Sequence, residues 1–189
     1  VPGFGDPAAW LLLVGLAPGA HGSNRTGRMF TRDKSGDFLY PALHRAGLCD
    51  RPDSTHRGDG MTMTGCFITA AVRCAPPANK PSLQEQVRCR PYLVRELALL
   101  DRLKVIVPLG GIGWDATLRS LATLGYKVTT LYPGPDGLPE LDALKAAVSE
   151  RTAALFITNP EDTGIFNPRI EDFIQVVHDA GGLTVYDQA

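Results

Sequence analysis

The sequence predicts an α/β protein built around parallel strands. Short apolar runs bounded by Gly, Pro, Asn or Asp alternate with stretches whose apolar residues recur at about the 3.6-residue period of a helix. The chain of 189 residues is 44% hydrophobic and 21% charged, which is ordinary for a globular protein. This composition excludes a disordered tail, a coiled coil and a collagen-like repeat.

Six runs have the length and composition of buried strands. They are residues 10–15, 66–72, 104–109, 126–131, 153–158 and 183–187. Alternation of such strands with helices is typical of α/β architecture throughout the chain.

Helices are predicted between these strands. A capping box of Ser82 and Glu85 opens a helix to about Leu100, with Pro91 kinking or restarting it. Residues 140–149 and 168–180 have helical apolar spacing, and a further helix begins at Ser35 or Gly36. The irregular segments 17–37 and 49–64 are expected to be loops, and the first is too long for a simple connector.

Charge divides the chain near residue 120. Residues 1–120 carry a net charge of +5 and residues 121–189 a net charge of −6, although the whole chain is near neutral at −1. Twelve of the fifteen N-terminal cations are Arg, the side chain best shaped for phosphate. A basic half points to nucleic acid, whereas two solvated faces of one domain would give the same asymmetry.

The longest apolar run, Trp10 to Leu16, is far shorter than the ~20 residues of a membrane span, and no basic, then apolar leader opens the chain. We therefore expect no membrane span and a cytoplasmic location.

The first strand leads into a loop that carries candidate chemistry, Gly15 to Gly36. Glycines let its backbone approach a ligand, Arg25 and Arg28 offer phosphate contacts, and Asp33 is a candidate base. The alternative is an ordinary turn in which Asp33 is the carboxylate at a helix N-terminus.

The loop carries the string Gly15-Leu-Ala-Pro-Gly19, His21-Gly-Ser-Asn-Arg-Thr-Gly-Arg28, Phe30-Thr31, Asp33 and Ser35-Gly36. This string resembles the first active-site motif of family-five (type B) uracil-DNA glycosylases. The resemblance runs from Val1 to about Leu118 and includes Asn79-Lys80-Pro81. It implies a three-layer α/β/α domain over residues 1–120, truncated at both ends, that acts on uracil-containing DNA. It also implies that Asp33 is catalytic and assists attack on the sugar C1′. The implied substrate-binding residues are Gly15, Ala17, Pro18, Gly19, His21, Asn24, Phe30 and Asn79.

Arg32 departs from this family pattern, because Gly generally precedes the catalytic Asp. We expect Arg32 to crowd the pocket or to add a cation beside Asp33.

The four cysteines form no Cys-x-x-Cys pair. Cys66 reads as a small buried hydrophobe within a strand, and Cys49 as a turn residue. The family resemblance makes Cys74 and Cys89 two of the four ligands of a [4Fe–4S] cluster, and the family takes its other two from an N-terminal Cys-x-x-Cys.

Residues 121–189 resemble a different protein, subunit 2 of glycine dehydrogenase (decarboxylating), the P-protein of the glycine cleavage system. The string Thr158-Asn-Pro-Glu-Asp-Thr-Gly164 is the most specific part. The resemblance implies an α/β fragment of a fold-type-I pyridoxal-phosphate enzyme, with Asp187 binding the cofactor's pyridinium nitrogen. Lys127 and Lys145 do not match the family's Schiff-base lysine. Asp187 alternatively caps the next turn.

Three functional hypotheses follow. The first is a DNA base-excision repair glycosylase that hydrolyses the N-glycosidic bond of uracil. Its activity is expected to be weak or absent, because no His-Pro-Ser- or His-Val-Ser-like segment follows Trp114. The second is a fragment of a pyridoxal-phosphate-dependent glycine decarboxylase. The third is a catalytically inactive chimera that binds nucleic acid through its Arg-rich half.

Overall fold

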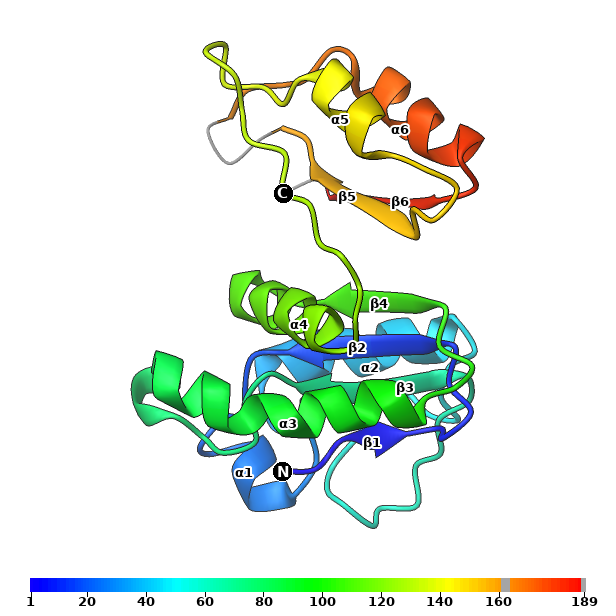
Figure 1. Ribbon diagram of the computed structural model, residues 1–189. Coiled ribbons are helices and arrows are strands. Elements are labelled where there is room, and N and C mark those ends of the chain that lie inside the picture. Colours follow the sequence, from blue (N-terminus) through cyan, green and yellow to red (C-terminus); the bar gives the residue numbers. More distant parts are fainter. Residues whose placement is uncertain (161–163, 188–189) are drawn as a thin grey trace. The chain divides into compact units, whose positions relative to one another are not determined.

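The computed structural model describes residues 1–160 and 164–187. The chain divides into two compact units, Val1–Val128 and Thr129–Ala189, each with its own sheet and helices (Figure 1). The two units are described separately below.

The first unit contains a four-stranded sheet in the order β1-β3-β2-β4. Its strands are β1 (Phe4–Gly5), β2 (Leu11–Gly15), β3 (Cys66–Ala70) and β4 (Val105–Pro108). β2 pairs in parallel with both β3 and β4, while the short β1 adds an antiparallel edge to β3. The parallel strands predicted at 10–15, 66–72 and 104–109 are confirmed, whereas β1 was not predicted.

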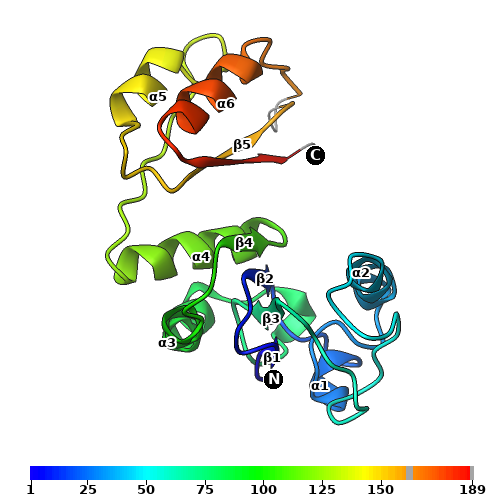
Figure 2. The ribbon, with the colours of Figure 1, turned by 90° about the vertical axis from the view of Figure 1, so that its right-hand side faces the viewer.

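Helices cover both faces of this sheet, as the edge-on view in Figure 2 shows. The helices α1 (Ser23–Thr26) and α2 (Lys34–Arg45) lie on one side, and α3 (Leu83–Leu99) and α4 (Gly111–Thr123) on the other. Alternate residues of β2 feed two separate cores. Leu11 and Leu13 pack with the α2 side, and Leu12 and Val14 with the α3 side. The predicted three-layer α/β/α class is confirmed.

The helix predicted after residue 82 is α3, and its capping box is present. The N–H of Glu85 donates to Ser82 Oγ at 3.3 Å, and the N–H of Ser82 donates to Glu85 Oε2 at 2.7 Å. Pro91 lies inside one continuous helix, so the helix does not restart there. The helix expected from Ser35 or Gly36 begins one residue earlier, at Lys34.

The second unit contains β5 (Ala154–Thr158) and β6 (Leu183–Asp187), which pair in parallel. Helices α5 (Leu141–Ala147) and α6 (Ile170–Asp179) bury their apolar residues with Ile157 of β5 in a third core. These four elements confirm the strands predicted at 153–158 and 183–187 and the helices predicted at 140–149 and 168–180.

The strand predicted at 126–131 is wrong. These residues form no regular element and are mostly exposed, with Tyr126 57% and Val128 41% accessible. An apolar run becomes a strand only where a neighbouring strand completes its hydrogen bonds, and no described strand pairs with this segment.

Among the described residues, no helix is both long enough and apolar enough to cross a membrane.

Candidate active site

The loops after β2 and β3 leave the sheet from the same edge. The last strand pair is Gly15 with Ala70, and beyond it the N–H of Ala71 donates to the Gly15 carbonyl at 2.9 Å. The next residue, Val72, donates to the Leu16 carbonyl at 3.0 Å. Loops that follow the carboxyl ends of neighbouring parallel strands are where α/β proteins bind ligands.

Asp33 stands at the end of the first of these loops as the N-cap of α2. Its Oδ1 accepts the N–H of Gly36 at 2.8 Å, so the helix-capping interpretation is correct. The second oxygen, Oδ2, faces the turn at Gly19, because a Cβ built on Gly19 would lie 3.9 Å from it. One oxygen thus fixes the carboxylate to the helix, and the other faces the loop.

Phe30 connects the strand end to the start of α2. Its ring covers Gly15, where an added Cβ would lie 2.7 Å from Phe30 Cζ. Its carbonyl oxygen touches Gly36, where an added Cβ would lie 1.9 Å away. Both glycines are therefore required by close packing against the half-buried Phe30.

The other residues expected to bind substrate differ in exposure. Pro18 is buried, Ala17 and Gly19 are half-buried, and His21 and Asn24 are exposed. The N–H of Asn24 donates to the Gly19 carbonyl at 3.0 Å, which closes the turn before α1. These residues share one loop with Asp33.

Asn79 comes from the neighbouring loop after β3. It is exposed at the end of the short 3₁₀ helix η1 (Pro77–Asn79), with a left-handed φ of 55° that Asn tolerates better than most residues. The N–H of Asn79 donates to the Pro76 carbonyl at 3.2 Å. Its position at the carboxyl edge follows from the parallel pairing of β2 and β3.

The two arginines expected to contact DNA have different environments. Arg25, in α1, is exposed and available to phosphate. Arg28 is buried, and its Nη1 lies 2.6 Å from Asp59 Oδ1. The pairing of the buried guanidinium with a carboxylate indicates a structural role for Arg28, and its expected contact with DNA stays a prediction.

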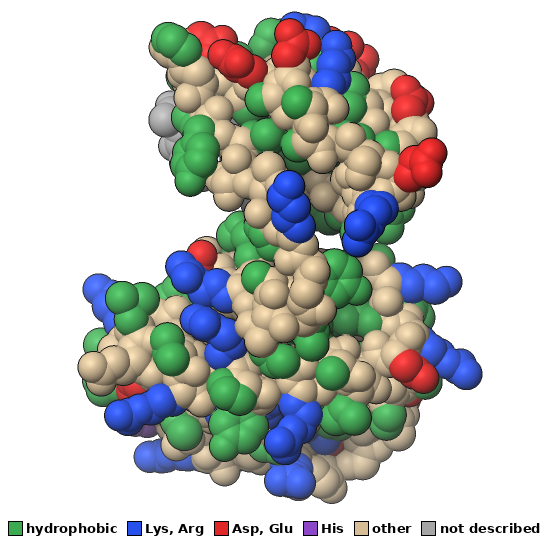
Figure 3. All heavy atoms as spheres, viewed as in Figure 1, with side chains coloured by type: hydrophobic (Ala, Val, Ile, Leu, Met, Phe, Trp, Pro, Cys, Tyr) green, Lys and Arg blue, Asp and Glu red, His purple; other side chains and the backbone are tan. Residues whose placement is uncertain are grey.

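On the face shown in Figure 3, basic side chains gather on the first unit and acidic ones on the second.

The side chain of Arg32 is exposed, and the expectation that it crowds the pocket or adds a cation beside Asp33 stays a prediction. Its φ is 54°, in the left-handed region that favours glycine. The backbone conformation therefore explains why Gly suits this position.

A polar cluster around Asp59, which contacts this loop through Arg28, was not predicted from the sequence. Asp59, from the segment between α2 and β3, accepts the N–H groups of Thr55 and Met61 at 2.9 and 3.0 Å. Burial alone would raise its pKa, but these hydrogen bonds and the Arg28 guanidinium hold the pKa of Asp59 well below its usual range. Asp59 is therefore ionised when it pairs with Arg28.

Tyr40 supports the same loop from α2. The fully buried phenol donates to the Met29 carbonyl at 2.7 Å. Burial is the main reason that the pKa of Tyr40 is raised to about 12.

Cys74 and Cys89 flank the loop after β3. Cys74 is exposed, while the Sγ of the half-buried Cys89 accepts the N–H of Arg73 at 3.5 Å. Among residues 1–160 and 164–187, no three His, Cys, Asp or Glu side chains are grouped to hold a metal ion. These residues do not complete a four-thiolate cluster site.

The other two cysteines are both buried. Cys66 has the buried position expected of it, and burial raises its thiol pKa to about 12. Cys49, expected in a turn, instead packs in the core on the α2 side, where its Sγ donates to the Arg51 carbonyl at 3.1 Å.

Asp187 ends β6, where its backbone pairs with Thr158. The side chain of Asp187 lies outside the described part of the structure, as do residues 161–163 of the 158–164 string. The buried Asn159 accepts the N–H of Asn167 at 2.7 Å and so holds its own loop. Lys127 and Lys145 are exposed. The cofactor-binding role expected for Asp187 stays a prediction.

Comparison with known proteins confirms the glycosylase resemblance. A sequence model of the uracil DNA glycosylase superfamily matches residues 2–166. The chain is 58% identical to the type-5 uracil-DNA glycosylase of Thermus thermophilus over 118 residues, which cover 62% of this chain and 53% of that protein. It is 46% identical to the type-5 uracil-DNA glycosylase of Pyrobaculum aerophilum over 121 residues, which cover 64% and 53%. The chain spans about half the length of these curated relatives.

The second resemblance is also confirmed. The chain is 49% identical over 88 residues to a Halobacterium salinarum protein named "Probable glycine dehydrogenase (decarboxylating) subunit 2". This match covers 47% of the chain and only 18% of that protein.

Proposed function

Since the chain belongs to the uracil DNA glycosylase superfamily, we propose that it binds uracil-containing DNA and hydrolyses the bond between uracil and its deoxyribose. The observation that carries this proposal is the placement of Asp33. Its Oδ1 is fixed by the N–H of Gly36, and its Oδ2 faces the loop that leaves the carboxyl end of β2. We assign this activity to residues 1–120, and a cytoplasmic location suits an enzyme whose substrate is DNA.

The chemistry needs a carboxylate in this position. Cleavage of an N-glycosidic bond develops positive charge on the sugar and negative charge on the departing base. Asp33 stabilises the sugar cation or orients the water that attacks C1′. Uracil departs with the electrons of the broken bond, the sugar keeps the hydroxyl of the water, and the remaining proton of the water goes to the uracil anion. The nucleotide must first leave the base stack, and the loop 15–30 with Asn79 forms the proposed pocket.

We propose that this activity is slow. Segments of the His-Pro-Ser or His-Val-Ser kind stabilise the uracil anion in the family, and none follows Trp114 in the sequence. Loss of one positioned donor to a developing anion costs roughly 10²–10³-fold in rate.

A pair of substitutions separates the catalytic role of Asp33 from its capping role. Asparagine caps helices about as well as aspartate, so Asp33→Asn should keep the free energy of unfolding within about 0.5 kcal/mol. Asp33→Ala should lose about 1 kcal/mol. Both variants should lose uracil release, measured with protein in excess over labelled DNA. Equal release by wild type and Asp33→Asn would leave only DNA binding as the function.

We propose that Cys74 and Cys89 are cluster ligands that do not hold a stable [4Fe–4S] cluster without further thiolates. Iron and acid-labile sulfide in the purified protein should be far below one cluster per chain. A stoichiometric cluster that Cys74→Ser leaves intact would contradict this ligand assignment.

We assign residues 121–189 to a P-protein-like fragment, on the strength of the 49% identity to the Halobacterium protein. Asp187 would bind the pyridinium nitrogen of pyridoxal phosphate there, but the described residues supply no lysine to anchor the cofactor. Added pyridoxal phosphate should therefore be removed completely by desalting. A cofactor absorbance that persists would favour the glycine decarboxylase hypothesis for this region.

A further inference from the structure

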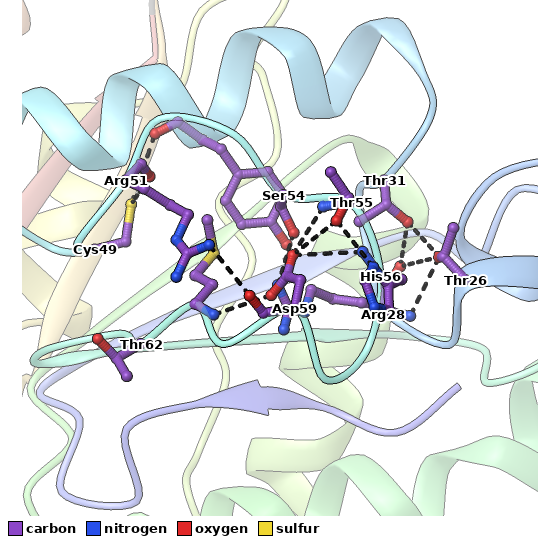
Figure 4. Close-up of polar contacts among 12 residues, drawn as sticks. Thr26, Arg28, Thr31, Cys49, Arg51, Ser54, Thr55, His56, Asp59 and Thr62 are labelled. Carbon is purple, nitrogen blue, oxygen red and sulfur yellow. Dashed lines mark hydrogen bonds and ion pairs between the residues drawn. The ribbon is translucent and has the colours of Figure 1, made fainter.

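A buried ion pair joins the loop that carries Asp33 to a second loop. Arg28 precedes Asp33 by five positions, and its Nη1 lies 2.6 Å from Asp59 Oδ1 and 3.0 Å from Ser54 Oγ. The side chains of Arg28 and Asp59 are only 4% and 7% exposed. Figure 4 shows these three residues converging from the two loops.

Hydrogen bonds within its own loop hold the Asp59 carboxylate in place, in addition to its ion pair with Arg28. Its Oδ2 accepts the N–H of Thr55, and its Oδ1 accepts the N–H of Met61. The Thr55 hydroxyl also donates to Oδ2, at 3.3 Å. The carboxylate is thus fixed by its own loop and presents a rigid anchor to the guanidinium.

Hydrogen bonds link Arg28 to residues that lie next to Asp33 in the loop. The Arg28 carbonyl accepts the Thr31 hydroxyl at 2.8 Å, and Thr31 in turn contacts the Thr26 hydroxyl. Thr31 is buried and lies two positions before Asp33. A second tie holds the same loops together, because the N–H of Arg57 donates to the Thr26 carbonyl at 2.9 Å.

We infer that Asp59 is a positioning residue for Asp33, acting through Arg28 and Thr31 to hold the loop 26–33 in the conformation that presents the carboxylate. This inference rests on the proposed glycosylase function. Asp59 belongs to none of the motifs identified in the sequence. Substitution of Asp59 should slow the bond-breaking step, because Asp33 acts in that step. It should change DNA affinity less.

The test compares two substitutions in one loop. Asp59→Asn removes the buried charge with almost no change in shape. Asp53→Asn makes the same chemical change at an exposed position six residues earlier and is the matched control. Asp59→Glu, which restores a carboxylate, is the rescue variant.

Uracil release is measured with protein in excess over labelled DNA. The maximal rate of Asp59→Asn should fall about 10- to 100-fold, as expected for a catalytic group misplaced by about 1 Å. The protein concentration for half-maximal rate should stay within about twofold. Asp59→Glu should recover part of the rate, and Asp53→Asn should match wild type. An unchanged maximal rate in a folded Asp59→Asn would overturn the inference.

Amide hydrogen exchange at Gly36 is the second measurement, because this N–H donates to Asp33. Its exchange should speed up about tenfold or more in Asp59→Asn, while the amides of Leu12 and Val14 in the buried β2 keep their wild-type rates. Equal acceleration in β2 would indicate general destabilisation and overturn the positioning role. If Asp59→Asn does not fold, Ser54→Ala removes the neighbouring contact to Arg28 and should show the same selective effect, in smaller measure.

The two proposals fail in different ways. If wild type releases no more uracil than Asp33→Ala, the proposed function is wrong, and Gly36 exchange alone decides whether Asp59 positions Asp33. If wild type releases uracil and Asp59→Asn releases it equally fast, only the positioning role is wrong.

Discussion

The ring of Phe30 occupies the space that a side chain on Gly15 would need. A Cβ added to Gly15 would lie 2.7 Å from Phe30 Cζ, well inside van der Waals contact. Phe30 also has a left-handed φ of 55°, so its backbone as well as its ring is fixed by this arrangement. The end of β2 and the proposed uracil pocket are therefore one packed unit.

Gly15→Ala should displace Phe30 and weaken both folding and binding. Overpacking of this kind costs about 1–3 kcal/mol of unfolding free energy, which urea denaturation measures. Affinity for a uracil-containing oligonucleotide should fall in a fluorescence anisotropy titration. Gly111→Ala is the control, because a Cβ at Gly111 would meet nothing within 4 Å and Gly111 is not among the residues assigned to the pocket. Equal behaviour of the two variants would argue against the packing of Phe30 on Gly15.

Arg32→Gly should stabilise the protein. A residue with a side chain pays about 1–2 kcal/mol in the left-handed region, and the greater freedom of unfolded Gly offsets part of the gain. The net increase should be roughly 0.5–1 kcal/mol, visible as a higher thermal midpoint. Asn79→Gly is the comparison, since Asn79 has a similar φ of 55° but tolerates it. A larger gain at Asn79 than at Arg32 would contradict this explanation.

Stability should decline in alkaline solution because of Tyr40. Its pKa is raised from the usual 10.0 to about 12 in the folded protein, so the folded state holds its proton more tightly than the unfolded state. This contribution is complete below pH 10 and is lost as pH rises toward 12. In Tyr40→Phe the unfolding free energy should drop by about 1 kcal/mol with the lost hydrogen bond, and this part of the alkaline decline should vanish. Parallel pH profiles for the two proteins would refute the assignment.

Arg25 should contribute a phosphate contact. Arg25→Gln should reduce the slope of log affinity against log salt concentration by about one. Arg169→Gln provides the control, because Arg169 is an exposed arginine of the second unit that pairs with Asp172. Titrations of one oligonucleotide at several salt concentrations give both slopes. A loss of slope in the Arg169 variant instead would place DNA on the acidic unit.

The sequence predicted those features whose signals are local. The runs that became β2, β3 and β4 were predicted correctly because strands of a parallel sheet are short apolar segments bounded by turn residues. The Ser82–Glu85 capping box located the start of α3 because its two partners are three residues apart. The apolar run at 126–131 was misread because composition does not reveal whether a neighbouring strand exists.

The interior of the candidate site was not predictable in the same way. Asp33 was found because it belongs to a contiguous motif. Arg28 was assigned to DNA because its partner, Asp59, lies 31 positions away in a loop with no recognisable pattern. From the sequence alone, an Arg in a basic segment is expected to be solvent exposed. Its burial depends on a carboxylate that only the folded chain brings close.

Asp33 caps α2 and, in the proposed function, also acts on the sugar, and this combination has an evolutionary consequence. Under that proposal, a descendant that lost uracil excision would still be selected to fold, and the hydrogen bond from Gly36 would still favour a capping residue at position 33. Asn or Ser would satisfy that selection as well as Asp does. Drift at this position would therefore remove the negative charge first and keep the cap, so Asn or Ser at position 33 in a related chain would mark a lineage that kept the fold after losing the reaction.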